Sequence, residues 1–413
     1  MPGPASTRTK PILTDRVLVA ATTLLLFVVP FAGGAGTRGA ALLIAVAALL
    51  VRWRASLAAL ALFPRDVAAP VAAWVAMAVS SVAWSVNPRF SAGELRPEIL
   101  YAVAGLVVFF LAARMPRVRP WMWAAAAGTL LATLGTVLQP EWITPSISRH
   151  PVDGGPGYLS THLVLLAPLL FAAILAGIES TRRRTLFAAV AFVVIAGCAW
   201  QTANRIVWLA FAAQIVTTIV AWRASALARG HRARLVSAVA LLCGAIAVAA
   251  FAASVVEREE QVSHYRVKEG SIEADIRPRI WERAFERFHD APWLGHGFGR
   301  EILARDFEPL TPRLIEHPLL QHAHNVFADV ALQLGSVGLA IFAWLLLALA
   351  ARYWTMLADR ATVASGIAGL AVLTGFVVKN LTDDFFHRHN ALAFWCLQGA
   401  LLGLAQRAKE KGS

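Results

Sequence analysis

Residues 325–350 read NVFADVALQLGSVGLAIFAWLLLALA, and this stretch decides the fold. Its single charged side chain, Asp329, lies near one end, and the stretch exceeds the roughly 20 residues with which a helix crosses a bilayer. Across all 413 residues, 58% are hydrophobic and 15% are charged. A soluble domain of this size needs more polar surface to cover its core. The sequence therefore predicts an integral membrane protein.

Similar apolar runs recur along the chain, and we predict about twelve membrane-spanning helices. They cover residues 16–33, 38–51, 67–85, 97–113, 120–138, 159–177, 185–201, 204–222, 235–254, 325–350, 361–379 and 390–406. The second run is short enough to be re-entrant. The first resembles a signal peptide because cations precede it, but the many spans that follow favour an uncleaved first helix.

The positions of Lys and Arg predict the orientation of these spans. The cations gather in alternate gaps between spans, including 52–54, 114–119, 182–184, 223–234 and 407–411. Cytoplasmic loops of membrane proteins carry an excess of Lys and Arg, so both termini are predicted to be cytoplasmic. An even number of spans agrees with that orientation.

The predicted fold class is all-α: a polytopic transmembrane helix bundle of about 12 spans with one large folded external loop. Residues 1–254 carry spans one to nine, residues 255–324 form the loop, and residues 325–413 carry spans ten to twelve. The loop mixes charges of both signs with aromatic residues, which is typical of a folded segment rather than a disordered one.

Composition also excludes two classes of function. The net charge of +13 does not indicate nucleic-acid binding, because the cations lie at span ends rather than on one folded patch. The cysteines Cys198, Cys243 and Cys396 all lie in apolar spans and form no CxxC pair. We interpret them as small buried hydrophobic side chains, without redox or disulfide chemistry.

Arg205 is the first candidate for chemistry. Residues 201–208, QTANRIVW, place it at the outer end of an apolar helix, where a cation close to hydrocarbon costs free energy. One interpretation is an arginine that snorkels to headgroup phosphates. The other is an anion site, because a guanidinium fork binds phosphate oxygens bidentately.

A second candidate region is residues 275–288, DIRPRIWERAFERF, which predict a helix beginning at Pro278. One apolar face is predicted to consist of Trp281, Ala284, Phe285 and Phe288. Arg277 lies at the helix N-terminus, where unpaired amides and the helix dipole already favour an anion. Arg279 is a weaker second candidate, and the other arginines form a stripe typical of solvent or headgroup contact.

Three alternating glycines follow this helix in residues 292–299, PWLGHGFG. Glycine permits sharp backbone turns or a close approach to a ligand, so Gly295 and Gly297 are candidate substrate-binding positions. A dinucleotide-binding interpretation fails, because the motif follows no predicted strand.

The third region is His322-Ala323-His324-Asn325, which enters the tenth span. Histidine suits proton transfer near neutral pH, and a general base is our favoured interpretation. Structural histidines remain an alternative, and a metal site would need further ligands in a fixed set. We predict no metal or other cofactor, and we interpret the pair Asp383-Asp384 as helix-cap or salt-bridge residues.

The order of these motifs resembles that of a known family. Arg205 at an outer helix start, Arg277 four residues before Trp281, the glycine segment 292–299 and His324-Asn325 at a span entrance follow one another. This series resembles the O-antigen ligase and O-antigen polymerase superfamily of bacterial envelope glycosyltransferases. The number of spans and the single large loop match as well, so the resemblance covers most of the chain.

The resemblance implies an inner-membrane glycosyltransferase of lipopolysaccharide biosynthesis, with the large loop and the active site in the periplasm. It would transfer an O-antigen glycan from undecaprenyl diphosphate to lipid A–core oligosaccharide, with inversion and without a divalent metal. His324 would be the general base, and Arg205 and Arg277 would bind the diphosphate. The extra His322 leaves open which histidine is the base. The substrate-binding candidates are Arg279, His322, Asn325, Gly295 and Gly297.

Three alternatives remain on the sequence alone. The first two are an O-antigen polymerase and a protein O-oligosaccharyltransferase. Polymerases of this superfamily often have two sizeable outer loops, whereas only residues 255–324 form a large one here, which favours a ligase. The third is a transporter or flippase for an anionic lipid-linked glycan. Transporters place polar groups near the membrane midplane and often show repeats, and neither feature is evident in this sequence.

Overall fold

The structure, a computed structural model, describes residues 13–115, 118, 120–138, 156–177, 190, 193–200, 202, 204–226, 244–249, 251–253, 277–302, 322–382 and 384–412. These residues form helices joined by turns and contain no strand, which confirms the predicted all-α class. The predictions for Cys243, for Asp383 and for most of the loop 255–324 lie outside the described residues. Cys198 and Cys396 are buried, as predicted.

The labelled helices are α1 (Leu13–Val28), α2 (Ala35–Val51), α3 (Trp53–Leu60), α4 (Arg65–Ser80), α5 (Pro88–Leu95), α6 (Tyr101–Ala113), α7 (Pro120–Leu138), α8 (Pro156–Gly177), α10 (Ile206–Ala224), α12 (Arg277–Asp290), α14 (Val326–Thr355), α15 (Val363–Lys379) and α16 (Arg388–Gly412). Most of the labelled helices overlap predicted spans, whereas α3, α5 and α12 lie between them. A single π-helical turn, Arg96–Leu100, joins α5 to α6. Further helical segments cover residues 193–200, 244–249 and 251–253.

Within the described residues, five helical stretches are long and apolar enough to cross a membrane. They are Ala32–Val51, Arg65–Ala83, Pro88–Ala113, Ile206–Ala224 and Val326–Ala358. The shorter apolar helices are Trp123–Gly135, Gly157–Leu169, Gly244–Ala253 and Val363–Lys379. A helical membrane protein is thus supported, while the number of about twelve spans stays a prediction.

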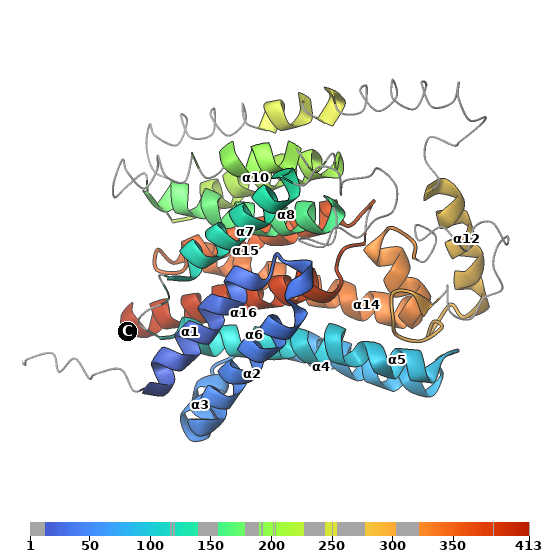
Figure 1. Cartoon of the computed structure of the whole chain (residues 1–413), viewed down its shortest axis with the longest axis horizontal. Coiled ribbons are helices and arrows are strands. Elements are labelled where there is room, and N and C mark those ends of the chain that lie inside the picture. The colour runs from blue at the N-terminus through green and yellow to red at the C-terminus, as the bar shows by residue number, and fades with distance from the viewer. Residues whose placement is uncertain are drawn as a thin grey trace, which may run out of the picture.

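The helices lie side by side in one bundle, and α12 lies across one end of it (Figure 1). The main core forms where α6 and α16 pack along their length, and the small glycines make that approach possible. A Cβ at Gly399 or Gly403 would collide with the backbone carbonyl of Leu106 or Phe110 on the facing helix. A second core joins α8 to α10, and Val378 of α15 packs against it.

Several predicted cytoplasmic residues meet at the end of the bundle away from α12. Arg52 pairs with Asp15, and Arg114 pairs with Glu410 at 2.6 Å between Nη2 and Oε1. Arg407 donates to the backbone carbonyl of Met115 at 2.6 Å. These contacts join segments between spans that the predicted alternating topology places on the same side of the membrane. The orientation of this end relative to the cell stays a prediction.

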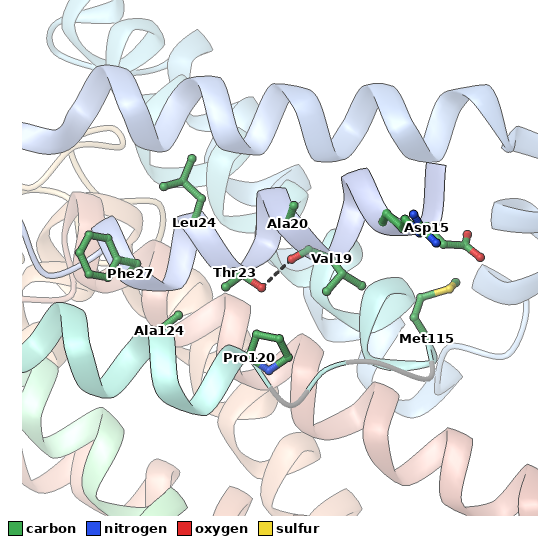
Figure 2. A pocket seen from close by; sticks show the side chains of 10 residues that line it. Asp15, Val19, Ala20, Thr23, Leu24, Phe27, Met115, Pro120 and Ala124 are labelled. Atoms are coloured by element: carbon green, nitrogen blue, oxygen red, sulfur yellow. Dashed lines mark hydrogen bonds between the residues drawn. The ribbon is translucent and has the colours of Figure 1, made fainter. Parts of the chain in front are cut away.

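A cavity also lies at this end, away from the polar site described below. It is an apolar groove of about 620 Å³ between α1 and the start of α7, with Leu24, Phe27 and Ala124 on its walls (Figure 2). Asp15 and Met115 close its polar end. Because the groove is apolar and borders membrane helices, hydrocarbon rather than a glycan suits it.

Candidate active site

The segment 322–325 forms a buried turn directly before α14. The Asn325 side chain caps that helix, because its Oδ1 accepts hydrogen bonds from the amides of Phe327 and Ala328 at 2.9 and 3.1 Å. Its amide nitrogen donates to the carbonyl of Leu381 at 2.9 Å. The preceding residue, His324, has φ of 51°, in the left-handed region, and its side chain is 8% exposed. Such strained non-glycine residues concentrate at functional sites.

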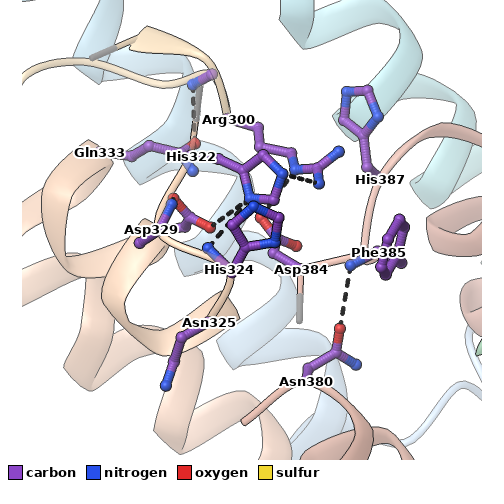
Figure 3. A network of polar contacts seen from close by, with 12 residues as sticks. Arg300, His322, His324, Asn325, Asp329, Gln333, Asn380, Asp384, Phe385 and His387 are labelled. Carbon is purple, nitrogen blue, oxygen red and sulfur yellow. Dashed lines mark hydrogen bonds and ion pairs between the residues drawn. The ribbon is translucent and has the colours of Figure 1, made fainter. Parts of the chain in front are cut away.

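A buried polar network surrounds this turn (Figure 3). Arg300 Nη2 lies 2.6 Å from His322 Nε2, and Arg300 Nε lies 3.2 Å from Asp384 Oδ2. His322 Nδ1 lies 3.7 Å from Asp329 Oδ2, and the His322 and His324 rings lie 4.0 Å apart between centroids. The backbone amide of Ala323 donates to Asp329 Oδ1 at 2.8 Å. Three segments far apart in sequence thus meet at the turn.

The charges of this network are tuned by burial. Burial raises the pKa of Asp384 to about 7, although the Arg300 guanidinium opposes that shift. Burial alone would lower the pKa of Arg300, but Asp384 and its other partners outweigh it and hold the pKa above its usual value. The carboxyl groups of Asp384 and Asp329 lie in one cluster, and the negative charge of Asp329 further raises the pKa of Asp384.

Aromatic rings support two cations beside this network. The Phe385 ring lies between Arg300, 5.7 Å from the ring centroid, and Lys379, 5.1 Å away. Tyr158 of α8 packs edge-on against Phe385, and its hydroxyl lies 3.4 Å from Arg300 Nη1. Cation–π contacts of desolvated groups stabilise such an arrangement. Positive charge is consequently concentrated beside this network.

Helix α12 brings Arg277 to the same turn. The helix begins at Arg277, and one turn later Trp281 Nε1 donates to the carbonyl of Ala323 at 2.8 Å. The N-terminus of α12 therefore lies next to the residue between the two histidines. The start of the helix at Arg277 agrees with the sequence prediction within one residue, and Arg279 lies in the same first turn.

The predicted apolar face of α12 was partly wrong. Ala284 is buried as predicted and Phe288 is partly buried, but Phe285 is 65% exposed, and Ile280 is buried in its place. The cause is the packing of α12 on α14, because Ala284 and Phe288 cluster with Ala323 and Leu332. The buried face is thereby rotated by about one residue from the one that the aromatic residues indicate.

Arg205 lies at the same end of the bundle. It is the residue that immediately precedes α10, as predicted. Helix α10 runs antiparallel to α15, because Val378 packs near the start of α10 and Val363 packs near its end. The C-terminal end of α15 leads directly to the histidine turn, since the carbonyl of Asn380 accepts from the amide of Val326 at 3.1 Å.

The glycine segment packs against α14 at a break in that helix. At Gly335 the helix has φ of 66°, and the amides of Ser336 and Val337 turn to the carbonyls of Pro292 and Trp293, at 2.8 and 3.2 Å. In exchange, the amides of His296 and Gly297 donate to the carbonyls of Leu332 and Gln333, both at 2.9 Å. The four hydrogen bonds join the loop to the interrupted helix.

The sharp turns predicted for this segment are confirmed. Gly295, Gly297 and Gly299 have φ of 67°, 112° and 134°. A Cβ at Gly295 would collide with the backbone of Gln333, and one at Gly297 with Ser85. Close approach to protein accounts for these glycines, and direct contact of Gly295 and Gly297 with substrate stays a prediction.

We expect Gly297→Ala to lower the melting temperature of the purified protein in detergent. The substitution needs a φ that alanine avoids and places a methyl group against Ser85, which together cost on the order of 1–3 kcal/mol. Gly93→Ala is the matched control, because nothing lies within 4 Å of a Cβ there. Equal melting temperatures for the two variants would contradict this account.

The sequence interpretation missed most of the network around His322. Arg300, Asp329 and Tyr158 belong to no recognisable motif. Arg300 contacts His322, 22 positions away, and the carbonyl of Tyr158 accepts from Asn390, 232 positions away. Asp329 lies within an apolar span. Asp384 was interpreted as a salt-bridge residue, and its pair with Arg300 confirms that. The available signal was the presence of ionisable residues within or beside apolar spans, which usually marks a functional site.

Two clusters in the described part of the chain have donor atoms close enough to hold a metal ion. They are Glu94, Glu98 and His387, and His322, Asp329 and Asp384. An arginine pairs with each: Arg388 Nη2 lies 3.4 Å from Glu94 Oε1, and Arg300 contacts two members of the other cluster. Because these partners already balance the carboxylates, the donor sets fit ion pairs better than a divalent cation.

Fold and site together define a class of protein: a helical membrane protein with a buried histidine and several cationic residues at one end of its bundle. Comparison with known proteins narrows this class. Residues 169–343 match the model of the family Wzy_C, described as O-antigen ligase. An O-antigen ligase of Pseudomonas aeruginosa is 24% identical over 277 residues, which are 63% of this chain and 58% of that relative. The chain thus matches less than two thirds of that relative's length.

Both comparisons support the family resemblance that the motifs predicted: the matched segment is similar to O-antigen ligases. The match runs from α8 into α14 and includes Arg205, Arg277, the glycine segment and His324.

Proposed function

We propose that this protein is an O-antigen ligase, which transfers a glycan from undecaprenyl diphosphate to lipid A–core oligosaccharide. The observation that carries the proposal is the left-handed, buried His324, with the start of α12 on one side and the Arg205 end of α10 nearby. A base and anion-binding groups in one place are what glycosyl transfer from a diphosphate requires. The family resemblance agrees with this chemistry.

In the proposed reaction, a hydroxyl oxygen of the acceptor sugar attacks the anomeric carbon of the donor glycan. The bond between that carbon and the diphosphate oxygen breaks, and the diphosphate leaves with the electron pair. The hydroxyl proton passes to the His324 imidazole. Attack opposite the leaving group inverts the anomeric centre.

Arg205 and Arg277 are proposed to bind the departing diphosphate. The N-terminus of α12, where Arg277 lies, adds unpaired amides and the positive end of the helix dipole. Negative charge that develops on the leaving group is stabilised most strongly in a site that excludes water. Arg279, in the first turn of α12, is proposed as a further donor to the diphosphate. Asn325 is the cap that fixes the histidine turn.

His324 rather than His322 is proposed as the base. His322 Nε2 lies 2.6 Å from an arginine nitrogen, and its Nδ1 lies 3.1 Å from the backbone amide of His324. Both of these partners only donate hydrogen bonds, and a neutral imidazole has a single acceptor nitrogen, so the lone pair of His322 is already engaged. This geometry favours His324 in the choice that the sequence left open.

The test is reconstitution of the purified protein in liposomes with undecaprenyl-diphosphate glycan and lipid A–core. Formation of glycan-bearing lipid A–core supports a ligase. A longer lipid-linked glycan would instead indicate a polymerase, and glycan transport without any product would indicate a transporter. A gene deletion gives the matching result in cells: uncapped lipid A–core, with lipid-linked glycan accumulating.

Chelation is expected to leave the initial rate of transfer in the reconstituted system unchanged within about twofold. Arginines and a helix N-terminus supply the positive charge that a divalent ion would otherwise bring to a diphosphate. The measurement compares initial rates with EDTA, without EDTA, and with Mg²⁺ added back after EDTA. Loss of activity with EDTA and recovery with Mg²⁺ would contradict the metal-independent mechanism.

A further inference from the structure

Arg300 directly follows the glycine segment and is held by a rigid backbone. The amide of Gly299 donates to Gln333 Oε1 at 2.8 Å, and the amide of Ile302 donates to the carbonyl of Gly299 at 2.9 Å. The Arg300 side chain is 10% exposed and extends into the network instead of to solvent (Figure 3). Its ion pair with buried Asp384 makes displacement of the guanidinium costly. The position of this charge is therefore fixed by the fold.

The contact between Arg300 and His322 has a chemical consequence. A guanidinium has five N–H donors and no acceptor, so at 2.6 Å from Arg300 Nη2 the His322 Nε2 must carry a lone pair. The amide of His324 lies 3.1 Å from Nδ1 and competes for the single lone pair of a neutral ring, so neither contact favours protonation. A protonated imidazole has no lone pair at either nitrogen. His322 is therefore neutral in this arrangement.

The carboxylates around His322, by contrast, favour its protonated form. Asp329 Oδ2 lies 3.7 Å from its Nδ1, and the Asp384 carboxylate also attracts positive charge to the ring. His324 stacks beside it, and Tyr158 contacts Arg300 rather than the ring. The carboxylates alone would favour a proton on His322. Arg300 opposes them with a fixed cation and with a hydrogen bond that protonation would abolish.

We propose that Arg300 is a positioning residue that keeps His322 neutral, so that His324 alone takes the proton of the acceptor. The inference rests on the proposed function, because it assigns a role within the same site. Arg300 acts through His322 and does not touch the reacting atoms. Without Arg300, the two neighbouring histidines would compete for protons, and a charged His322 would repel the imidazolium that forms on His324.

The experiment measures kcat and KM for the lipid-linked donor between pH 5 and pH 9 (about the window in which histidine titrates) with the full-length protein in liposomes. The wild-type kcat is expected to fall at low pH with a slope of about one proton. For Arg300→Gln we expect kcat about 10²-fold lower, a little-changed KM and an acid limb that approaches two protons. Arg300→Lys keeps the cation and is expected to restore the one-proton limb.

A double-variant cycle tests whether Arg300 acts through His322. With His322→Gln in the background, Arg300→Gln should cost little further activity, and the acid limb should return to one proton. Arg283→Gln is the matched control, because that arginine is 41% exposed and pairs across one turn of α12 with Glu286. Size-exclusion profiles and melting temperatures in detergent identify any variant that has lost its fold.

Two results would overturn the proposal. One is a one-proton acid limb in Arg300→Gln together with a raised KM for the donor, which would make Arg300 part of the anion site. The other is a double variant whose loss of activity equals the product of the losses in the two single variants. Retained activity in a His324 variant would instead contradict the proposed function itself, so the two failures can be told apart.

Discussion

His324→Asn is expected to lower kcat for glycan transfer by about 10²–10⁴-fold, because a positioned general base contributes a factor of that size. Asparagine is the informative replacement, since it tolerates the left-handed backbone at this position, where φ is 51°. The loss should then reflect chemistry and not a rearranged turn. The measurement is the initial rate in liposomes, together with the glycan-bearing lipopolysaccharide that a deletion strain regains on complementation.

His289→Gln is the control for this substitution. His289 lies on the exposed side of α12, where its Nδ1 contacts the carbonyl of Phe285 at 2.8 Å. That variant should keep wild-type transfer. A His324→Asn protein that inserts normally and still transfers glycan at more than about a tenth of the wild-type rate would exclude His324 as the base.

Arg205→Ala and Arg277→Ala are each expected to lower kcat/KM for the lipid-linked donor by about 10²–10³-fold, as loss of a single donor to a developing charge does. Lysine at either position should recover only part of the loss, because it offers a point charge instead of a planar fork. Both predictions concern the donor, so KM for lipid A–core should change little. Titration of each substrate in turn separates the two effects.

Arg283→Ala serves as the control on α12, since its guanidinium pairs with Glu286 on the exposed surface. An arginine that merely meets headgroups would behave like this control, with transfer close to wild type. That outcome at Arg205 would favour the snorkelling interpretation. The same outcome at Arg277 would exclude the N-terminus of α12 as part of the diphosphate site.

Local sequence signals predicted a large part of the fold. Apolar runs located the helices, because burial in hydrocarbon depends on composition and length alone. The start of α12 near Pro278 and the turns at the glycines followed from backbone restrictions of single residues. The cap at Asn325 and the position of His324 directly before α14 also depend on adjacent residues.

The network around His322 could not be predicted in this way. Arg300, Asp384 and Tyr158 come from three segments, and which of them meet depends on how the helices pack. The rotated face of α12 has the same origin, because α14 selects Ile280 over Phe285 for burial. Tertiary contacts decide both cases, and hydrophobic periodicity carries no information about the partner.

The break in α14 at Gly335 has a consequence for how the molecule assembles. An interrupted helix within a bilayer exposes main-chain groups that lipid cannot satisfy, so the interruption needs partners from protein. Here Pro292, Trp293, His296 and Gly297 supply them. These residues precede Gly335 along the chain and so leave the ribosome first. The docking partners are already synthesised when α14 enters the membrane, and the helix can complete its hydrogen bonding as soon as it arrives.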